Sequence, residues 1–145
     1  MFLFLHEIVH ILTGFIIGII FYKRFKDIKL FISAVSVSLL LDLDHYIDLF
    51  LYTLRQNIVI TPLMIFTENY FAKSEKVYVI FHSYEIVILL LLLSLFRNKI
   101  KKYLLLLASS VLIHILIDQL TYRPFILEYF FVYRLINGFS LSAFR

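Results

Sequence analysis

The hydrophobic positions of this chain form long runs that short polar segments separate. A helix needs roughly 20 consecutive apolar residues to cross the hydrocarbon core of a bilayer, which is about 30 Å thick. Four segments meet this requirement, at about 2–22, 29–52, 77–96 and 103–122. The pattern therefore predicts an all-α fold, a polytopic membrane bundle of four transmembrane helices.

The remaining segments are more polar. Residues 53–76 contain Pro62 and several charged side chains, and we expect an external loop there with one short helix. The tail 124–145 is apolar, but Glu128 and Arg134 interrupt it, which favours an interfacial or re-entrant C-terminal helix over a fifth span. Since neither a repeat nor a low-complexity linker divides the chain, we expect a single membrane domain over residues 1–145.

Composition supports a membrane environment. Hydrophobic residues make up 62% of the chain, whereas soluble domains contain about 45–50%. A small core cannot bury this excess, so lipid must cover it. The chain has no Cys, which excludes a thiolate metal site and a cysteine nucleophile. Any metal must be bound by nitrogen and oxygen.

The net charge of +4 does not point to nucleic acid, because the basic residues form two short runs, in 23–29 and 97–102. Runs of this kind mark cytoplasmic loops. We therefore expect a multi-pass protein of the cell (inner) membrane with both turns in the cytoplasm and the N-terminus outside. The first span is not expected to be a cleavable signal, because it lacks a basic start and contains His6 and His10.

Ionisable side chains occur inside all four predicted spans, where each costs a few kcal/mol unless it is paired or functional. Nine of them lie 12–17 residues along the chain from the basic end of their own helix. At about 1.5 Å per residue these offsets correspond to a common layer roughly 18–26 Å above the cytoplasmic edge. The residues in this layer are His6, His10, Asp42, Asp44, His45, His82, Glu85, His114 and Asp118. Asp48 and Glu7 are interpreted as capping or helix-end residues off the inward faces.

Their spacing places them in pairs on one face of each helix, because residues three or four apart are neighbours on a helix surface. Metal sites of helix bundles are built from such inward-facing pairs. Four carboxylates in this layer would carry about four negative charges, with no Lys or Arg expected there, and two divalent cations would neutralise them. The pairs are His6/His10, Asp42/His45, His82/Glu85 and His114/Asp118.

We therefore predict a site for one or two divalent metal ions. Imidazole and carboxylate ligands suit Zn first, with Mn, Fe, Co or Ni as alternatives. Asp44 and Glu85 are the candidate catalytic residues, one as general base and the other orienting a histidine. The predicted metal ligands are His6, His10, Asp42, His45, His82, His114 and Asp118.

These motifs resemble the membrane-bound metal-dependent hydrolases typified by the YdjM-like inner-membrane proteins. The resemblance spans His6 to Thr121 and implies a membrane-embedded hydrolase. Where that family often carries a His-Arg-Gly-x-Thr-His-Ser stretch, this chain has Val77 to Phe81 before His82, and Glu85 is the candidate replacement. The matching motifs are His6-x-x-x-His10 with Thr13-Gly14, Asp42-Leu43-Asp44-His45, His82-Ser83, and His114-x-x-x-Asp118-x-x-Thr121. The His-x-x-x-Asp spacing is also distantly similar to zinc-dependent phospholipases C.

The leading hypothesis is a hydrolase that uses metal-activated water to cleave a lipid ester or phosphoester at the outer leaflet. Membrane lipids are the expected partners, and the oligomeric state is open. Two alternatives remain at this point. Intramembrane His and Asp clusters also mark ion pathways in transporters and sensors, and a structural metal without catalysis would use the same ligands.

Overall fold

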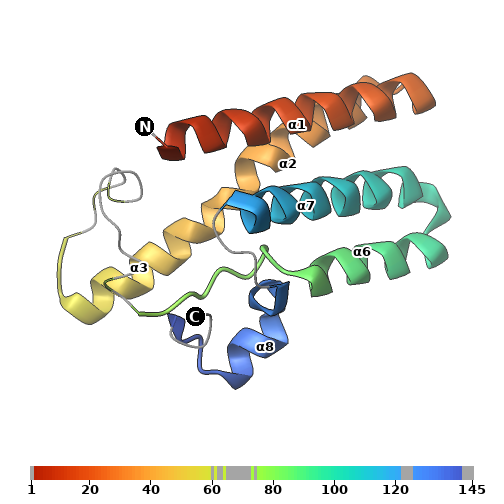
Figure 1. The fold of residues 1–145 in the computed structure, drawn as a ribbon. Coiled ribbons are helices and arrows are strands. Elements are labelled where there is room, and N and C mark those ends of the chain that lie inside the picture. The colour runs from red at the N-terminus through yellow and green to blue at the C-terminus, as the bar shows by residue number, and fades with distance from the viewer. Residues whose placement is uncertain are drawn as a thin grey trace.

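Figure 1 shows the computed structural model of this chain. The structure describes residues 2–59, 61, 64, 73, 75–121 and 126–141, with residues 2–4 by their backbone alone. This part of the chain is helical and contains no β-strand, which confirms the all-α fold for it. The helices are α1 (Phe2–Phe25), α2 (Ile28–Leu40), α3 (Asp44–Gln56), α6 (Tyr84–Phe96), α7 (Lys101–Thr121) and α8 (Phe131–Ile136), with 3-10 turns η1 (Leu41–Leu43), η2 (Asn98–Ile100) and η3 (Ile126–Tyr129).

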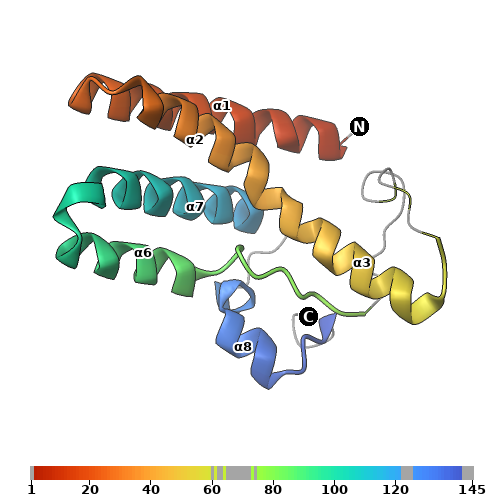
Figure 2. The same cartoon turned by 180° about the vertical axis from the view of Figure 1, so that it is seen from behind.

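Two helical hairpins pack side by side (Figures 1 and 2). The first joins α1 to α2, where Asp27 caps the start of α2 by accepting a 3.0 Å hydrogen bond from the Lys29 backbone N–H. The second joins α6 to α7 through η2. Leu30 and Ala34 of α2 pack with Leu106 of α7 in a buried cluster between the hairpins. This core fixes the height of α1 and α2 relative to α7.

Helix α1 approaches α2 closely at two glycines one turn apart. A Cβ at Gly14 would lie 2.3 Å from Ser38 Oγ, and a Cβ at Gly18 would lie 2.8 Å from Phe31 Cδ2. Small residues permit such close packing of helices in membranes, where van der Waals contact replaces the hydrophobic effect as the driving force. The approach is close enough that the position of α1 depends on both glycines.

Three helical stretches are long and apolar enough to cross a membrane, namely Leu5–Phe25, Ile28–Gln56 and Asn98–Thr121. Their outward faces remain apolar. On α1, Leu12, Ile16 and Ile20 are 56%, 57% and 58% exposed at a spacing of four residues. Large exposed apolar side chains in a continuous stripe are consistent with contact to lipid.

The structure corrects the boundaries of two predicted spans. The helix expected over 77–96 begins only at Tyr84, so α6 has 13 residues, or about 20 Å, and is shorter than a full span. Residues 77–83 are not helical. The span expected over 29–52 runs from Ile28 to Gln56 and contains η1, where the chain passes from α2 to α3 (Figure 2). Four spans remain a prediction.

The two basic turns lie at the same end of the bundle. Lys102 Nζ of the second hairpin lies 2.5 Å from Asp27 Oδ2 of the first, and the Tyr103 hydroxyl donates to the same oxygen at 3.1 Å. The hydrogen bond from Lys102 holds the pKa of the Asp27 carboxyl below its usual range. The pair ties the hairpins together at this end. Half of the predicted loop 53–76 lies outside the described residues, and its first four residues belong to α3 instead. The predicted C-terminal helix appears as α8.

Candidate metal centre

An extended segment, residues 75–83, replaces the first two turns of the predicted third helix. An extended chain cannot satisfy its own backbone polar groups, which must find partners elsewhere when water is excluded. On one side α3 supplies them: Asp44 Oδ2 accepts from the Phe81 N–H at 2.8 Å, and Asp48 Oδ1 accepts from the Tyr78 N–H at 3.2 Å. The carboxylates of α3 therefore hold the segment along that helix.

The C-terminal region holds the other side of the segment. Val77 N–H donates to the Phe139 carbonyl at 3.0 Å, and Leu141 N–H donates to the Glu75 carbonyl at 2.8 Å. These contacts clamp the beginning of the segment, before the chain reaches His82.

Arg134 of α8 anchors the end of the same segment. Its guanidinium, on a residue only 2% exposed, donates to the Val79 carbonyl and, at 3.0 Å, to the His82 carbonyl. Burial lowers the pKa of Arg134, and the nearby carboxylates Asp44 and Glu85 oppose that shift. An arginine retains its charge under such conditions. The expectation of no basic group near the layer is therefore wrong, because the tail folds back and brings one there.

The first ligand cluster joins α1 and α7. His6 Nε2 and His10 Nε2 lie 2.8 Å and 3.0 Å from Asp118 Oδ1, and 2.8 Å from each other. The i, i+4 spacing on α1 places both rings on one face, as the sequence predicts. His10 is fully buried and His6 nearly so. Three donor atoms thus converge on one point.

The second cluster joins η1, the extended segment and α7. Asp42 Oδ1 lies 3.2 Å from both His82 Nε2 and His114 Nε2, and the two nitrogens are 3.1 Å apart. The other oxygen of Asp118, Oδ2, lies 3.5 Å from each of these nitrogens. His114 also stacks on His10, with ring centroids 3.7 Å apart, so the two clusters adjoin.

Asp118 therefore faces both clusters, with one carboxylate oxygen for each. Tetrahedral coordination with bonds of about 2.0–2.1 Å separates neighbouring ligand atoms by about 3.3 Å. The separations of 2.8–3.5 Å in both clusters are close to this value. Nitrogen lone pairs at such distances repel unless a proton or a cation lies between them. These buried groups could hold a metal ion.

The second carboxylate oxygen of Asp42 also suits a cation. Asp42 Oδ2 is buried, and within the described part of the chain it has no hydrogen-bond partner. Buried polar atoms are usually paired, and an unpaired carboxylate oxygen next to histidine nitrogens is a natural metal ligand. The donor set, which has no sulfur, therefore fits a divalent ion.

Asp44 occupies a supporting position. Its Oδ2 lies 3.1 Å from His82 Nδ1, the ring nitrogen that faces away from Asp42. A carboxylate on the far nitrogen of a ligating histidine fixes the tautomer and orientation of the ring. Of the two roles predicted for Asp44, its contacts favour the orienting one. His45 lies at the edge, with Nε2 3.6 Å from Asp42 Oδ1.

Glu85 is not brought into the cluster. Its two oxygens accept hydrogen bonds from the backbone N–H groups of Phe131 and Val132, at 2.9 Å and 3.0 Å, at the start of α8. The i, i+3 pair predicted for His82 and Glu85 does not exist, because His82 precedes the first residue of α6. Glu85 anchors the C-terminal helix instead.

Comparison with protein-family models, curated proteins and solved structures gives no match to this chain. The resemblance to the YdjM-like family therefore remains a prediction.

Arg134 and Asp48 are the polar residues near the site that sequence reasoning missed. The sequence interpretation places Asp48 off the inward face of its helix, yet it is buried and accepts a hydrogen bond from the Tyr78 N–H. For Arg134 the one available signal was a charged residue within an apolar tail. That signal does not identify its partners, which lie more than 50 residues earlier in the chain.

Proposed function

We propose that this protein is a membrane-embedded hydrolase that uses two divalent metal ions, Zn first among the candidates. The observation that carries the proposal is the position of Asp118, whose two oxygens face two separate pairs of histidines. Paired sites with a shared carboxylate are common in hydrolytic enzymes that use two metals. His6, His10 and Asp118 would hold one ion, and Asp42, His82, His114 and Asp118 the other.

Charge counting agrees with two ions. Ionised Asp42, Asp44 and Asp118 contribute three negative charges, while two divalent cations and the nearby Arg134 contribute five positive ones. The excess of two positive charges suits a hydroxide and an anionic oxygen of the substrate. Bound ions of this kind lower the pKa of a coordinated water and polarise a phosphoryl or acyl oxygen.

Exposure indicates where a substrate would enter. The side chains of Asp42 and His45 are 20% and 24% exposed, whereas His6, His10, His82, His114 and Asp118 are at most 10% exposed. The site is therefore open on the side of η1 and the start of α3. His45, next to Asp42 on that side, is placed to exchange a proton with a substrate and is our candidate for the acid or base.

The proposed substrate is a lipid ester or phosphoester. The cluster lies at the end of the bundle opposite the basic turns, which under the positive-inside rule is the outer side. Leu43 and Tyr46, which adjoin Asp42 and His45 in the chain, are apolar or aromatic and 51% and 36% exposed. A lipid head group at that depth reaches the site without leaving the membrane.

The structure offers less support for ion transport. In the half of the bundle nearer the basic turns, Ser94 and Ser109 donate to carbonyls of their own helices, Leu91 and Leu105. Hydroxyl groups used in this way do not form a continuous polar path between helices. The use of these two hydroxyls within their own helices favours an enzyme over a transporter.

The test begins with full-length protein in detergent, its metal content measured by elemental mass spectrometry. We expect about two ions per chain and release of head groups or phosphate from native lipids, abolished by chelator and restored by added Zn²⁺. His114→Ala and Asp42→Ala should lose metal and activity together, while Asp27→Asn, a carboxylate at the far end, should keep both. Wild-type protein without metal would refute the site, and metal without hydrolysis would refute the enzyme.

A further inference from the structure

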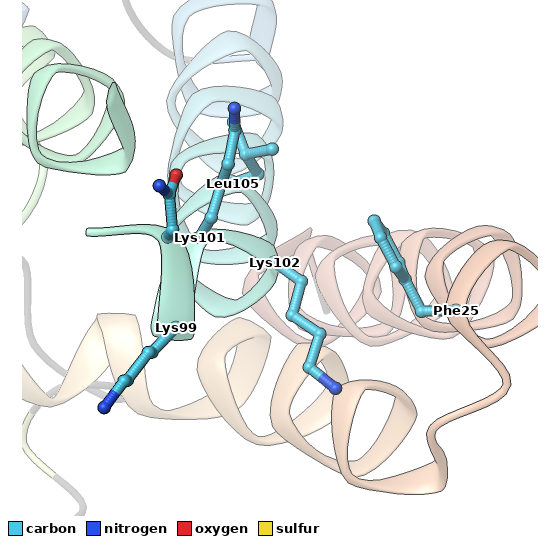
Figure 3. A pocket seen from close by; sticks show the side chains of 6 residues that line it. Phe25, Lys99, Lys101, Lys102 and Leu105 are labelled. Atoms are coloured by element: carbon cyan, nitrogen blue, oxygen red, sulfur yellow. The ribbon is translucent and has the colours of Figure 1, made fainter. Parts of the chain in front are cut away.

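A pocket of about 310 Å³ opens at the end of the bundle opposite the His/Asp cluster. It lies between the end of α1 and the turn that begins α7, as Figure 3 shows. Three lysines and one amide provide hydrogen-bond donors, and two apolar side chains complete the wall. The lining residues are Phe25, Asn98, Lys99, Lys101, Lys102 and Leu105.

The charge around this pocket is strongly positive. The turns 23–29 and 97–102 contain eight basic residues and one acidic residue, Asp27, which gives a net charge of 8 − 1 = +7. Asp27 is engaged by Lys102 and by the Tyr103 hydroxyl. It therefore fixes Lys102 at the pocket wall and does not compensate the charge of Lys99 and Lys101.

The pocket is also amphipathic. Phe25 and Leu105 supply hydrocarbon to its wall, and Phe96 and Ile100, close to its lysines along the chain, are 80% and 48% exposed. It sits at the ends of helices long enough to cross a membrane, where lipid phosphate groups are found. Basic pockets between membrane helices on the cytoplasmic side bind anionic head groups.

We propose that this pocket binds the phosphate group of an anionic phospholipid. The bound lipid is not the substrate of the metal centre, because Leu105 precedes His114 by nine residues and Asp118 by 13, or about 14–20 Å along α7. The proposal depends on the membrane location of the protein and not on its hydrolytic activity. Its failure would leave the proposed function untouched.

The experiment uses delipidated full-length protein in neutral detergent, where no membrane surface potential contributes. Native mass spectrometry counts bound lipid during titration with phosphatidylglycerol, and with phosphatidylcholine of the same chain length. We expect preferential binding of one phosphatidylglycerol. Inorganic phosphate serves as the competitor that separates a lipid from a free anion.

The double variant Lys99→Gln/Lys101→Gln should weaken phosphatidylglycerol binding by roughly 10- to 30-fold, since each basic residue near an anionic surface contributes about 1 kcal/mol. The matched control is Lys23→Gln/Arg24→Gln, which removes the same charge from residues that do not line the pocket, and it should change binding less than about threefold. Thermal unfolding checks that both variants are folded.

Three results would overturn the proposal: equal binding of both lipids, equal losses in the two double variants, or displacement of the lipid by inorganic phosphate at comparable concentration. Metal content, measured on the same samples, should be unchanged in both variants.

Discussion

His10 and Asp118 reach the His/Asp cluster from continuous helices, whereas His82 reaches it from an extended segment. A helix satisfies its own backbone, so its ligands need only the right spacing and a neighbouring helix at the right distance. The extended segment depends on side chains from α3 and α8 for its backbone partners. One half of the site therefore depends on helix packing, and the other half depends on buried polar side chains that hold the backbone.

The largest effect is expected at Arg134. Arg134→Gln removes charged donors from the carbonyls of Val79 and His82, and each buried unpaired carbonyl costs about 1–3 kcal/mol, or about 2–6 kcal/mol together. Thermal unfolding in detergent should show a large loss of stability. Arg134→Lys, which keeps the charge but not the planar fork, should recover only part of it. If Arg134→Gln unfolds at the wild-type temperature, the segment that carries His82 does not depend on this side chain for its position.

Packing of the helical half is tested at Gly14. The Cβ of Gly14→Ala would meet Ser38 Oγ at 2.3 Å, and crowding of this kind costs about 1–3 kcal/mol. Since His10 lies one turn from Gly14 on α1, metal affinity should fall as well. Adding Ser38→Gly removes the two nearest atoms and leaves the Ala34 carbonyl oxygen at 3.2 Å, so it should restore part of the stability and of the metal content. If the double variant is no better than Gly14→Ala, close approach of α1 and α2 does not position His10.

Orientation of His82 is tested at Asp44. Asp44→Asn keeps the shape but removes the charge facing His82 Nδ1, and loss of such support typically costs 10–100-fold in metal affinity. Competition titration with a chelating dye measures this change. The control in the helical half is Thr13→Val, because the Thr13 hydroxyl donates to the His10 backbone carbonyl and not to the His10 ring. Thr13→Val should change the metal affinity less than about threefold. Equal losses of metal affinity in Thr13→Val and Asp44→Asn would contradict a specific role of Asp44 in orienting His82.

The smallest effect is expected at Asp27, far from the cluster. Its lowered pKa means that the ion pair with Lys102 stabilises the fold above the unfolded-state pKa of about 3.9, and that this contribution is lost as pH falls through the lower folded-state value. Exposed pairs contribute little. The unfolding temperature of Asp27→Asn should lie slightly below that of the wild type at neutral pH. The difference should vanish in acid, and a difference that grows in acid would contradict the assignment.

Much of the helical half could be predicted from the sequence. The pairs His6/His10 and His114/Asp118 lie within single helices, so their spacing alone places each pair on one face. The distance of each residue from the basic turns predicts that α1 and α7 present these pairs at one end of the bundle, and the structure brings both pairs together there.

The apolar runs determined a helical fold suited to a membrane, and the absence of Cys restricted any metal to nitrogen and oxygen ligands. The tertiary structure decided that Asp118 faces two pairs of histidines, that Glu85 turns to α8, and that Arg134 supports His82. Apart from the contact between His114 and Asp118 within α7, these contacts join residues 36 to 112 positions apart. No local periodicity specifies them, because an unpaired backbone is satisfied by whichever side chain the packing of the whole chain brings within reach.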